Sequence, residues 1–150
     1  MNDELKLDAL KRFSLNLQSG KFNPLTYVDK NKANAIHWAA GCGHLDLAKY
    51  LIEVIGCSPH ISQGGKRSFG GRTPLHWASR NGHLPVVKYL VEICNVDIEA
   101  VTADGTTSFC WAAWQGHLDI MRYVLCSGFT MTHQELIQSK HDLRFLKFLD

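Results

Sequence analysis

The residues with the widest chemistry in this sequence are eight histidines and five cysteines, the side chains that most often bind transition metals. Five of the histidines recur in a pattern: His37 and His76 each precede a tryptophan, while His44, His83 and His117 each follow a glycine. Residues spaced evenly along a chain of repeats stay apart, and no two cysteines form the close pair of a metal site. We therefore expect no metal and no cofactor.

Nucleotide and covalent chemistry are also poorly represented. The segment 64–72 is rich in glycine, lysine and arginine, but it lacks the G-x-x-x-x-G-K-[ST] spacing that holds a phosphate. The sequence shows no G-x-S-x-G nucleophile motif and no cysteine-histidine signature of a protease family. We predict that the protein is not an enzyme and has no catalytic residues.

Composition sets the class of protein. The chain has 150 residues, 45% hydrophobic and 20% charged, which suits about one globular domain. A formal net charge of +2 is too small to draw the whole surface to nucleic acid or membrane. No apolar run approaches the roughly 18 residues of a membrane span, and the N-terminus is acidic rather than basic. An odd cysteine count without a disulfide pattern favours a reducing compartment, so we expect a soluble intracellular protein, cytoplasmic or nuclear.

The elements that position these residues come from a phrase that occurs three times, over residues 34–45, 73–84 and 107–118. Its first residue, Asn or Thr, can cap the start of a helix, and a proline in the second copy fits the first helical turn. The Gly-His pair ends that helix and permits a reversal. Apolar residues at helical spacing follow, so each copy predicts two antiparallel helices.

The second copy, Thr-Pro-Leu-His-Trp-Ala at residues 73–78, matches the T-P-L-H-x-A signature of ankyrin repeats. The Gly-His histidines are 39 and 34 residues apart (83 − 44 and 117 − 83), near the ankyrin period. The sequence thus resembles the ankyrin-repeat family over residues 29–131. This resemblance implies an all-α solenoid of stacked antiparallel helix pairs with hairpin-like turns, in which the recurring histidines hydrogen-bond the backbone of adjacent turns and repeats.

We predict one domain over residues 1–150, because stacked helix pairs share a continuous core whose two ends need caps. An amphipathic helix at 3–19 and a capping box opening at Thr132 fit the two caps. The predicted parts are an N-terminal cap at 1–28, a first repeat at 29–61 with an inserted loop at 58–71, a second repeat at 72–101, a third at 102–131 and a C-terminal cap at 132–150.

Four tryptophans fall into two groups. Trp38, Trp77 and Trp111 directly follow the signature position of the histidine, and we expect them to face the neighbouring repeat as a stacked, largely buried series. Trp114 lies three residues beyond Trp111, at a position that the resemblance places in the concave groove. We expect it to be partly exposed and to contact a partner.

The resemblance assigns partner binding to the concave groove and to the tips of the hairpin-like turns. Arginine and tryptophan most often anchor interfaces, so we expect the largest contributions from Arg72, Arg80 and Trp114. The alternative for the two arginines is simple solvation. The candidate partner-binding residues are Lys66, Phe69, Arg72, Arg80, Asn81, Asp104, Trp114 and Gln115.

These features predict a non-enzymatic protein–protein interaction module or scaffold, either a monomer or a subunit of a hetero-complex. The inserted loop is basic and contains no acid, which suits an acidic partner surface, although a tolerated insertion explains it equally well. Two alternatives remain open: a structural subunit of a large assembly, and a nucleotide or RNA binder in which Trp114 stacks a base while Lys66, Arg72 and Arg80 hold phosphate. Nucleic acid ranks below protein as the partner, and we expect no membrane binding.

Overall fold

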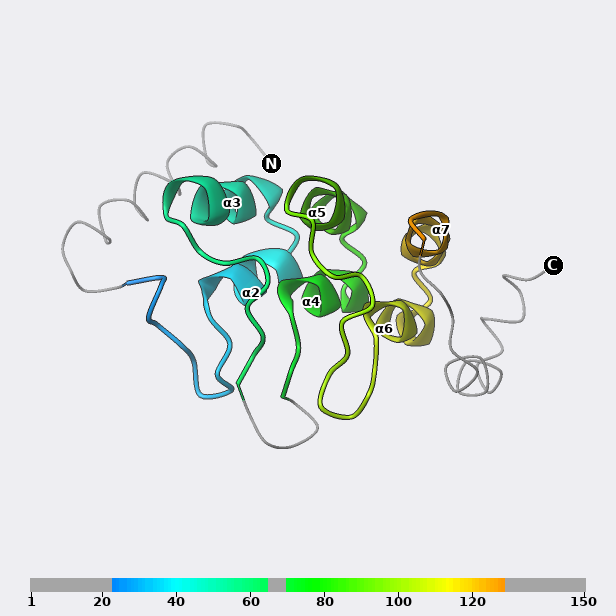
Figure 1. Ribbon diagram of the computed structural model, residues 1–150, viewed down its shortest axis with the longest axis horizontal. Coiled ribbons are helices and arrows are strands. Elements are labelled where there is room, and N and C mark those ends of the chain that lie inside the picture. The colour runs from blue at the N-terminus through cyan, green and yellow to red at the C-terminus, as the bar shows by residue number, and fades with distance from the viewer. Residues whose placement is uncertain (1–22, 65–69, 129–150) are drawn as a thin grey trace.

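Three helix pairs stand side by side in the computed structural model, which describes residues 23–64 and 70–128. Within these ranges the helices form two layers, with α2, α4 and α6 in one and α3, α5 and α7 in the other (Figure 1). Their bounds are α2 Ala35–Gly41, α3 Leu45–Lys49, α4 Pro74–Arg80, α5 Leu84–Lys88, α6 Ser108–Gln115 and α7 Leu118–Cys126. The predicted all-α solenoid of helix pairs is confirmed.

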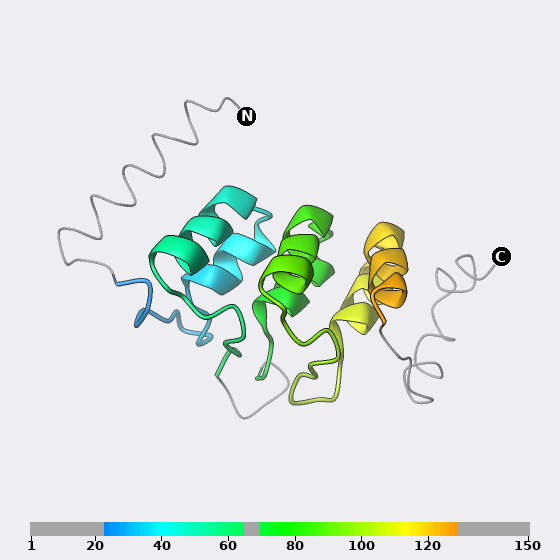
Figure 2. The same ribbon diagram turned by 45° about the horizontal axis from the view of Figure 1, so that its top comes forward.

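Two predicted elements lie outside the described residues: the helix at 3–19 and the capping box that opens at Thr132. Between the ends, α4 packs against α2 on one side and α6 on the other, so the central pair joins both neighbours. The turns between successive pairs all project from one side of the array (Figure 2). This arrangement places the first-layer helices next to the turn tips, along one continuous face.

The first-layer helices begin where the repeated phrase predicts. The backbone N–H of His37 donates to Oδ1 of Asn34 at 3.4 Å, and that of Cys110 donates to Oγ1 of Thr107 at 3.3 Å. Both bonds satisfy amide groups that a helix start leaves unpaired. In the second repeat Pro74 occupies the first turn, where its missing N–H costs nothing.

The reversal within each pair depends on a glycine with left-handed backbone. Gly82 has a φ of +81°, and a Cβ built on it lies 2.6 Å from Cε1 of His117 in the next repeat. Gly43 repeats this arrangement, with a φ of +72° and a Cβ position 2.5 Å from Nδ1 of His83. A side chain at either glycine therefore meets both backbone strain and the ring that joins the next repeat.

The substitution Gly82→Ala is expected to lower the free energy of unfolding by more than the roughly 1–2 kcal/mol of left-handed backbone strain, because His117 must also move. Gly105→Ala is the matched control, since Gly105 has a φ of +79° and open space around its Cβ position. Urea denaturation of both variants measures the difference. Equal losses would show that the contact with His117 adds nothing.

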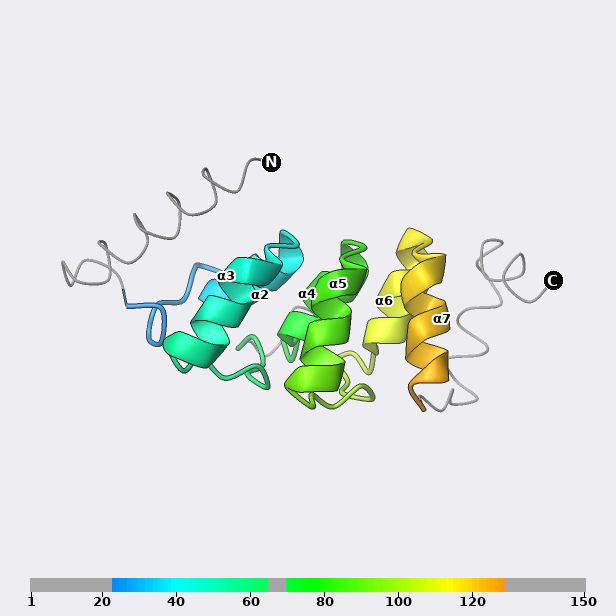
Figure 3. The ribbon, with the colours of Figure 1, turned by 90° about the horizontal axis from the view of Figure 1, so that it is seen from above.

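The second layer is held together by a repeated pair of contacts. The Tyr89 hydroxyl donates to Glu53 at 2.8 Å, and the Tyr123 hydroxyl donates to Glu92 at 3.0 Å. Both glutamates lie in π-helical turns, η1 (Tyr50–Val54) and η2 (Tyr89–Ile93), that extend α3 and α5, whereas α7 runs on as regular helix. Seen from above, α3, α5 and α7 lie side by side (Figure 3).

The apolar core lies between the two layers. Its largest cluster joins the second and third repeats and includes Phe109 of α6, which has no exposed surface. A smaller cluster around Ile36 and Leu51 fills the first repeat. Of the candidate binding residues that the structure describes, none belongs to either cluster.

Equivalent backbone hydrogen bonds close the three turn tips, at 2.7 to 2.9 Å. They run from Asp29 N to Ala33 O, from Gln63 N to Arg72 O, and from Thr102 N to Thr106 O. The bonded residues are four apart in the first and third tips and nine apart in the second. The extra five residues of the predicted inserted loop 58–71 therefore lie between Gln63 and Arg72.

Candidate functional site

A buried histidine joins α2, and another joins α4, to the tip of the next repeat. Nε2 of His37 donates to the carbonyl oxygen of Arg72 at 2.9 Å, and Nε2 of His76 donates to that of Thr106 at 3.2 Å. Burial lowers the pKa of each ring from 6.5 to about 4, against the raising effect of these hydrogen bonds. Both rings are therefore neutral structural groups, as the resemblance implied.

The histidines of the reversals bond to the preceding repeat, each to the last residue of its first-layer helix. Nε2 of His83 donates to Gly41 O and Nε2 of His117 donates to Arg80 O, both at 3.0 Å. His44 occupies this position in the first repeat, but it is exposed and its ring has no hydrogen-bond partner in the described part of the chain. The structural role is thus confirmed for four of the five recurring histidines.

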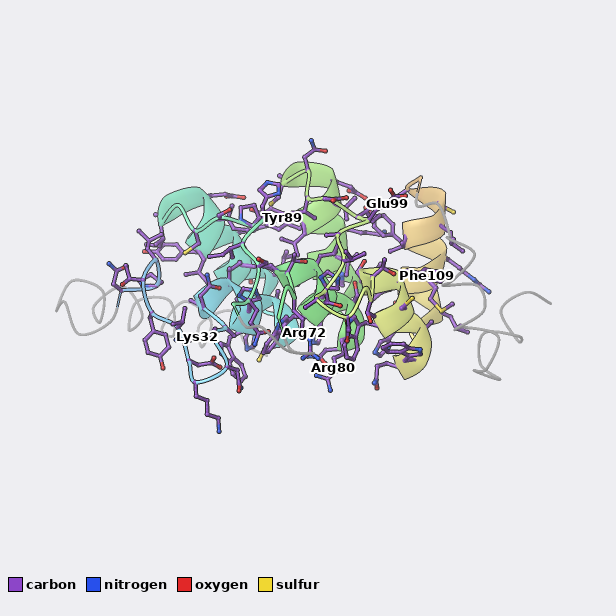
Figure 4. All side chains as sticks on the ribbon, turned by 60° about the horizontal axis from the view of Figure 1, so that its bottom comes forward. Lys32, Arg72, Arg80, Tyr89, Glu99 and Phe109 are labelled. Atoms are coloured by element: carbon purple, nitrogen blue, oxygen red, sulfur yellow. The ribbon has the colours of Figure 1, made fainter. Side chains whose placement is uncertain are left out.

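Arg72 and Arg80 converge on one aromatic ring. Their guanidinium carbons lie 4.8 Å and 5.2 Å from the ring centroid of Trp111, within the range of cation–π attraction. Arg72 precedes α4 and Arg80 ends it, and both reach the same side of the array (Figure 4). Together they border a hollow of about 40 Å³ lined by Arg72, His76, Trp77, Arg80, Asn81 and Trp111.

The electrostatics of this hollow are positive. Burial lowers the pKa of the Arg72 guanidinium, and the nearby charge of Arg80 lowers it further, while Asp104 acts in the opposite direction. The Asp104 carboxylate itself accepts hydrogen bonds from the Thr102 hydroxyl and the Thr106 backbone. The two positive charges of Arg72 and Arg80, both beside the Trp111 ring, favour the binding of an anion in the hollow.

The tryptophan positions differ from the sequence expectation. Trp38 is 47% exposed, so the prediction of a largely buried series is wrong for the first repeat, whereas Trp77 and Trp111 are of intermediate burial. The ring centroids of Trp38 and Trp77 lie 5.3 Å apart, and those of Trp111 and Trp114 lie 5.2 Å apart, both edge to face. The guanidinium groups of Arg72 and Arg80 lie over the Trp111 ring. The physical reason is that these rings lie beside the turn tips, where each repeat leaves its neighbour partly uncovered.

The remaining candidate residues are dispersed. Asn81 lines the hollow and also donates from Nδ2 to Gly41 O at 2.7 Å, while Trp114 is half-buried and Gln115 is exposed at the end of α6. Asp104 lies in the third tip. Lys66 and Phe69 lie outside the described residues.

Sequence reasoning missed Trp111 as a site residue, because it was grouped with Trp38 and Trp77 as part of the interface between repeats. It also missed Trp77 and His76, which line the same hollow. Arg72 and Arg80 lie at the two ends of α4, and this spacing was the available signal that both ends of the helix could reach one neighbour.

A linear array of helix pairs with turn tips along one face defines the class of repeat solenoids, which bind along extended surfaces. The family model "Ankyrin repeats (3 copies)" matches residues 6–101 and 54–135. The chain belongs to the ankyrin-repeat family.

Other comparisons add the fold alone. No curated protein matches the sequence. Among solved structures, a chain from the complex of a predatory endopeptidase of Bdellovibrio bacteriovorus with an immunity protein is 24% identical, with a TM-score of 0.57. The match covers 69% of this chain and 49% of that one, so the protein spans about half the length of this structural relative. Among the described residues, no helix has the length and apolarity of a membrane span.

Proposed function

We propose that the protein is a non-enzymatic interaction module that binds another protein through its concave groove and turn tips. Ankyrin repeats are protein–protein interaction modules, which supports the class. The observation that carries the proposal is the gathering of Arg72, Arg80 and Trp111 around one hollow between α4 and α6. Residues of these types supply most of the binding energy in protein interfaces.

The chemistry of the groove favours an acidic partner. Two guanidinium groups border the hollow, and the Asp104 carboxylate, whose charge acts on Arg72, accepts hydrogen bonds within the third tip. Complementary charge of this kind speeds association and selects among partners. All five thiols are free, and two of them, Cys42 and Cys126, are exposed, which supports an intracellular, reducing location.

The test compares partner capture by matched charge reversals. Arg80→Glu is expected to weaken capture by roughly 1–3 kcal/mol, the loss of an interface anchor. Lys88→Glu makes the same charge change on the exposed face of α5, in the other layer, and is expected to retain the partner. Quantitative mass spectrometry of proteins captured by wild type and both variants gives the measurement.

The control also decides against the proposal where it fails. A partner that Lys88→Glu loses and Arg80→Glu keeps would place the binding surface on the second layer. Neither side chain belongs to the apolar core, so both variants are expected to melt like wild type. Melting curves of both variants check that a loss of binding is not caused by unfolding.

A further inference from the structure

In the first repeat, a carboxylate in the turn tip accepts a hydrogen bond from the indole N–H of the tryptophan. Nε1 of Trp38 donates to Oδ2 of Asp29 at 3.2 Å. In the second repeat, Nε1 of Trp77 donates in the same way to Oε1 of Gln63 at 3.3 Å. Asp29 and Gln63 are equivalent residues, because the backbone N–H of each closes its tip.

The third repeat breaks this series. Thr102 occupies the equivalent place, and its short side chain donates instead within the tip, to Thr106 O at 3.0 Å and to Asp104. The indole N–H of Trp111 is buried and has no acceptor among residues 23–64 and 70–128. A buried donor without an acceptor is rare in folded proteins and calls for an explanation.

The same indole is the one flanked by Arg72 and Arg80. Both arginines and the indole line the hollow of about 40 Å³, which has room for a group of a few atoms, since one water needs about 10–15 Å³. The repeat that lacks its own acceptor is therefore the one with two cations beside it. A carboxylate would supply the acceptor that the Trp111 N–H lacks and would carry the charge that the two neighbouring guanidinium groups favour, because guanidinium–carboxylate bonds are strong and directional.

We propose that this hollow is a subsite for an aspartate or glutamate side chain of the partner protein. One oxygen of that carboxylate accepts the Trp111 N–H, as Asp29 does for Trp38, and the group lies between Arg72 and Arg80. The proposal rests on the proposed function and names the partner group that the groove recognises.

The experiment follows the Trp111 indole cross-peak in 1H–15N spectra of the 15N-labelled protein, assigned with Trp111→Phe. The probe is the blocked peptide acetyl-Gly-Glu-Gly-amide, with the glutamine peptide as its neutral match. We expect the glutamate peptide to move the Trp111 cross-peak saturably, and the glutamine peptide to bind at least tenfold more weakly. No movement of this cross-peak at any peptide concentration would overturn the proposal.

Two variants separate a binding site from a structural contact. Thr102→Asp restores the acceptor present in the first repeat, so it should shift the Trp111 cross-peak without peptide, raise the melting temperature and abolish peptide binding. Arg80→Gln should weaken peptide binding at least tenfold while the Trp111 cross-peak of the free protein persists. Peptide affinity unchanged in both folded variants would contradict the proposal.

Two further probes test the source of the anion. The peptide acetyl-Gly-Gly-Gly carries only a C-terminal carboxylate, and inorganic phosphate carries none. Tighter binding of either than of the glutamate peptide would show that a side-chain carboxylate is the wrong ligand. These titrations need no partner, so they can fail while the capture experiment with Arg80→Glu still succeeds, and the reverse also holds.

Discussion

Acidification from pH 6.5 to about 4 is expected to lower the free energy of unfolding by several kcal/mol. Burial depresses the pKa of His37 and His76 from 6.5 to about 4, so in this window the unfolded chain binds protons that the folded protein does not. The stability is therefore fully present above pH 6.5 and is lost as the pH falls toward 4. Each pKa unit corresponds to roughly 1.4 kcal/mol, which gives on the order of 3 kcal/mol per histidine.

The hydrogen bonds of His76 explain why protonation is so unfavourable. Its Nδ1 receives the backbone N–H of Thr73 at 3.1 Å and lies 2.8 Å from the Thr73 hydroxyl, while Nε2 donates to Thr106 O. A proton on Nδ1 would therefore face a donor. Folding in this neutral state fixes one tautomer and joins two repeats at once.

Urea denaturation across this pH range measures the effect, with the double variant His37→Gln/His76→Gln as control. Glutamine keeps an N–H donor and does not titrate, so the variant should show a much flatter dependence in the same window. Asp104, whose pKa is lowered mainly by its bond from Thr102, adds its own loss only at still lower pH. A variant as pH-sensitive as wild type would show that other groups control the acid transition.

The substitution Phe109→Ala is expected to lower the free energy of unfolding by roughly 3–5 kcal/mol, because it opens a cavity in the largest core cluster. Phe109 has no exposed surface and lies in α6, which packs against both α4 and α7. Thermal and urea denaturation provide the measurement. Val101→Ala is the control, since Val101 is 57% exposed and should change stability by less than about 0.5 kcal/mol. Similar losses in the two variants would show that α6 is not packed as described.

The helix pairs could be predicted because local signals agree with each other. A capping residue such as Thr107, the proline at position 74 and the left-handed glycines each mark a helix boundary, and the apolar spacing gives the buried face. The repeat boundaries at 29–61, 72–101 and 102–131 remain a prediction. The inserted loop was located only to 58–71, because pairing across a tip depends on backbone bonds that no residue type specifies.

The candidate site could be predicted only in part. Arg72 and Arg80 were found from residue type, but their convergence on Trp111 depends on the packing of α4 against α6. The exposure of Trp38 was missed because the repeated phrase shows which residues recur, not how far each neighbouring repeat covers them. The sequence did contain one unused signal: Asp29 and Thr102 precede Trp38 and Trp111 at the same spacing, and only one of them can reach the indole.

The pairing of Gln63 with Arg72 also bears on how such a protein can change over generations. The bond from Gln63 N to Arg72 O closes the second tip on the repeat side of the insertion, and Gln63 donates as well to Asn31 O in the first tip. Chain added or removed beyond that bond leaves the register of both repeats intact, and doubling its length costs only about 0.6 kcal/mol of closure entropy. Because Gly70 accepts a hydrogen bond from Ala103 N in the third tip, changes in length between Gln63 and Gly70 can accumulate while both anchors of the loop stay in place.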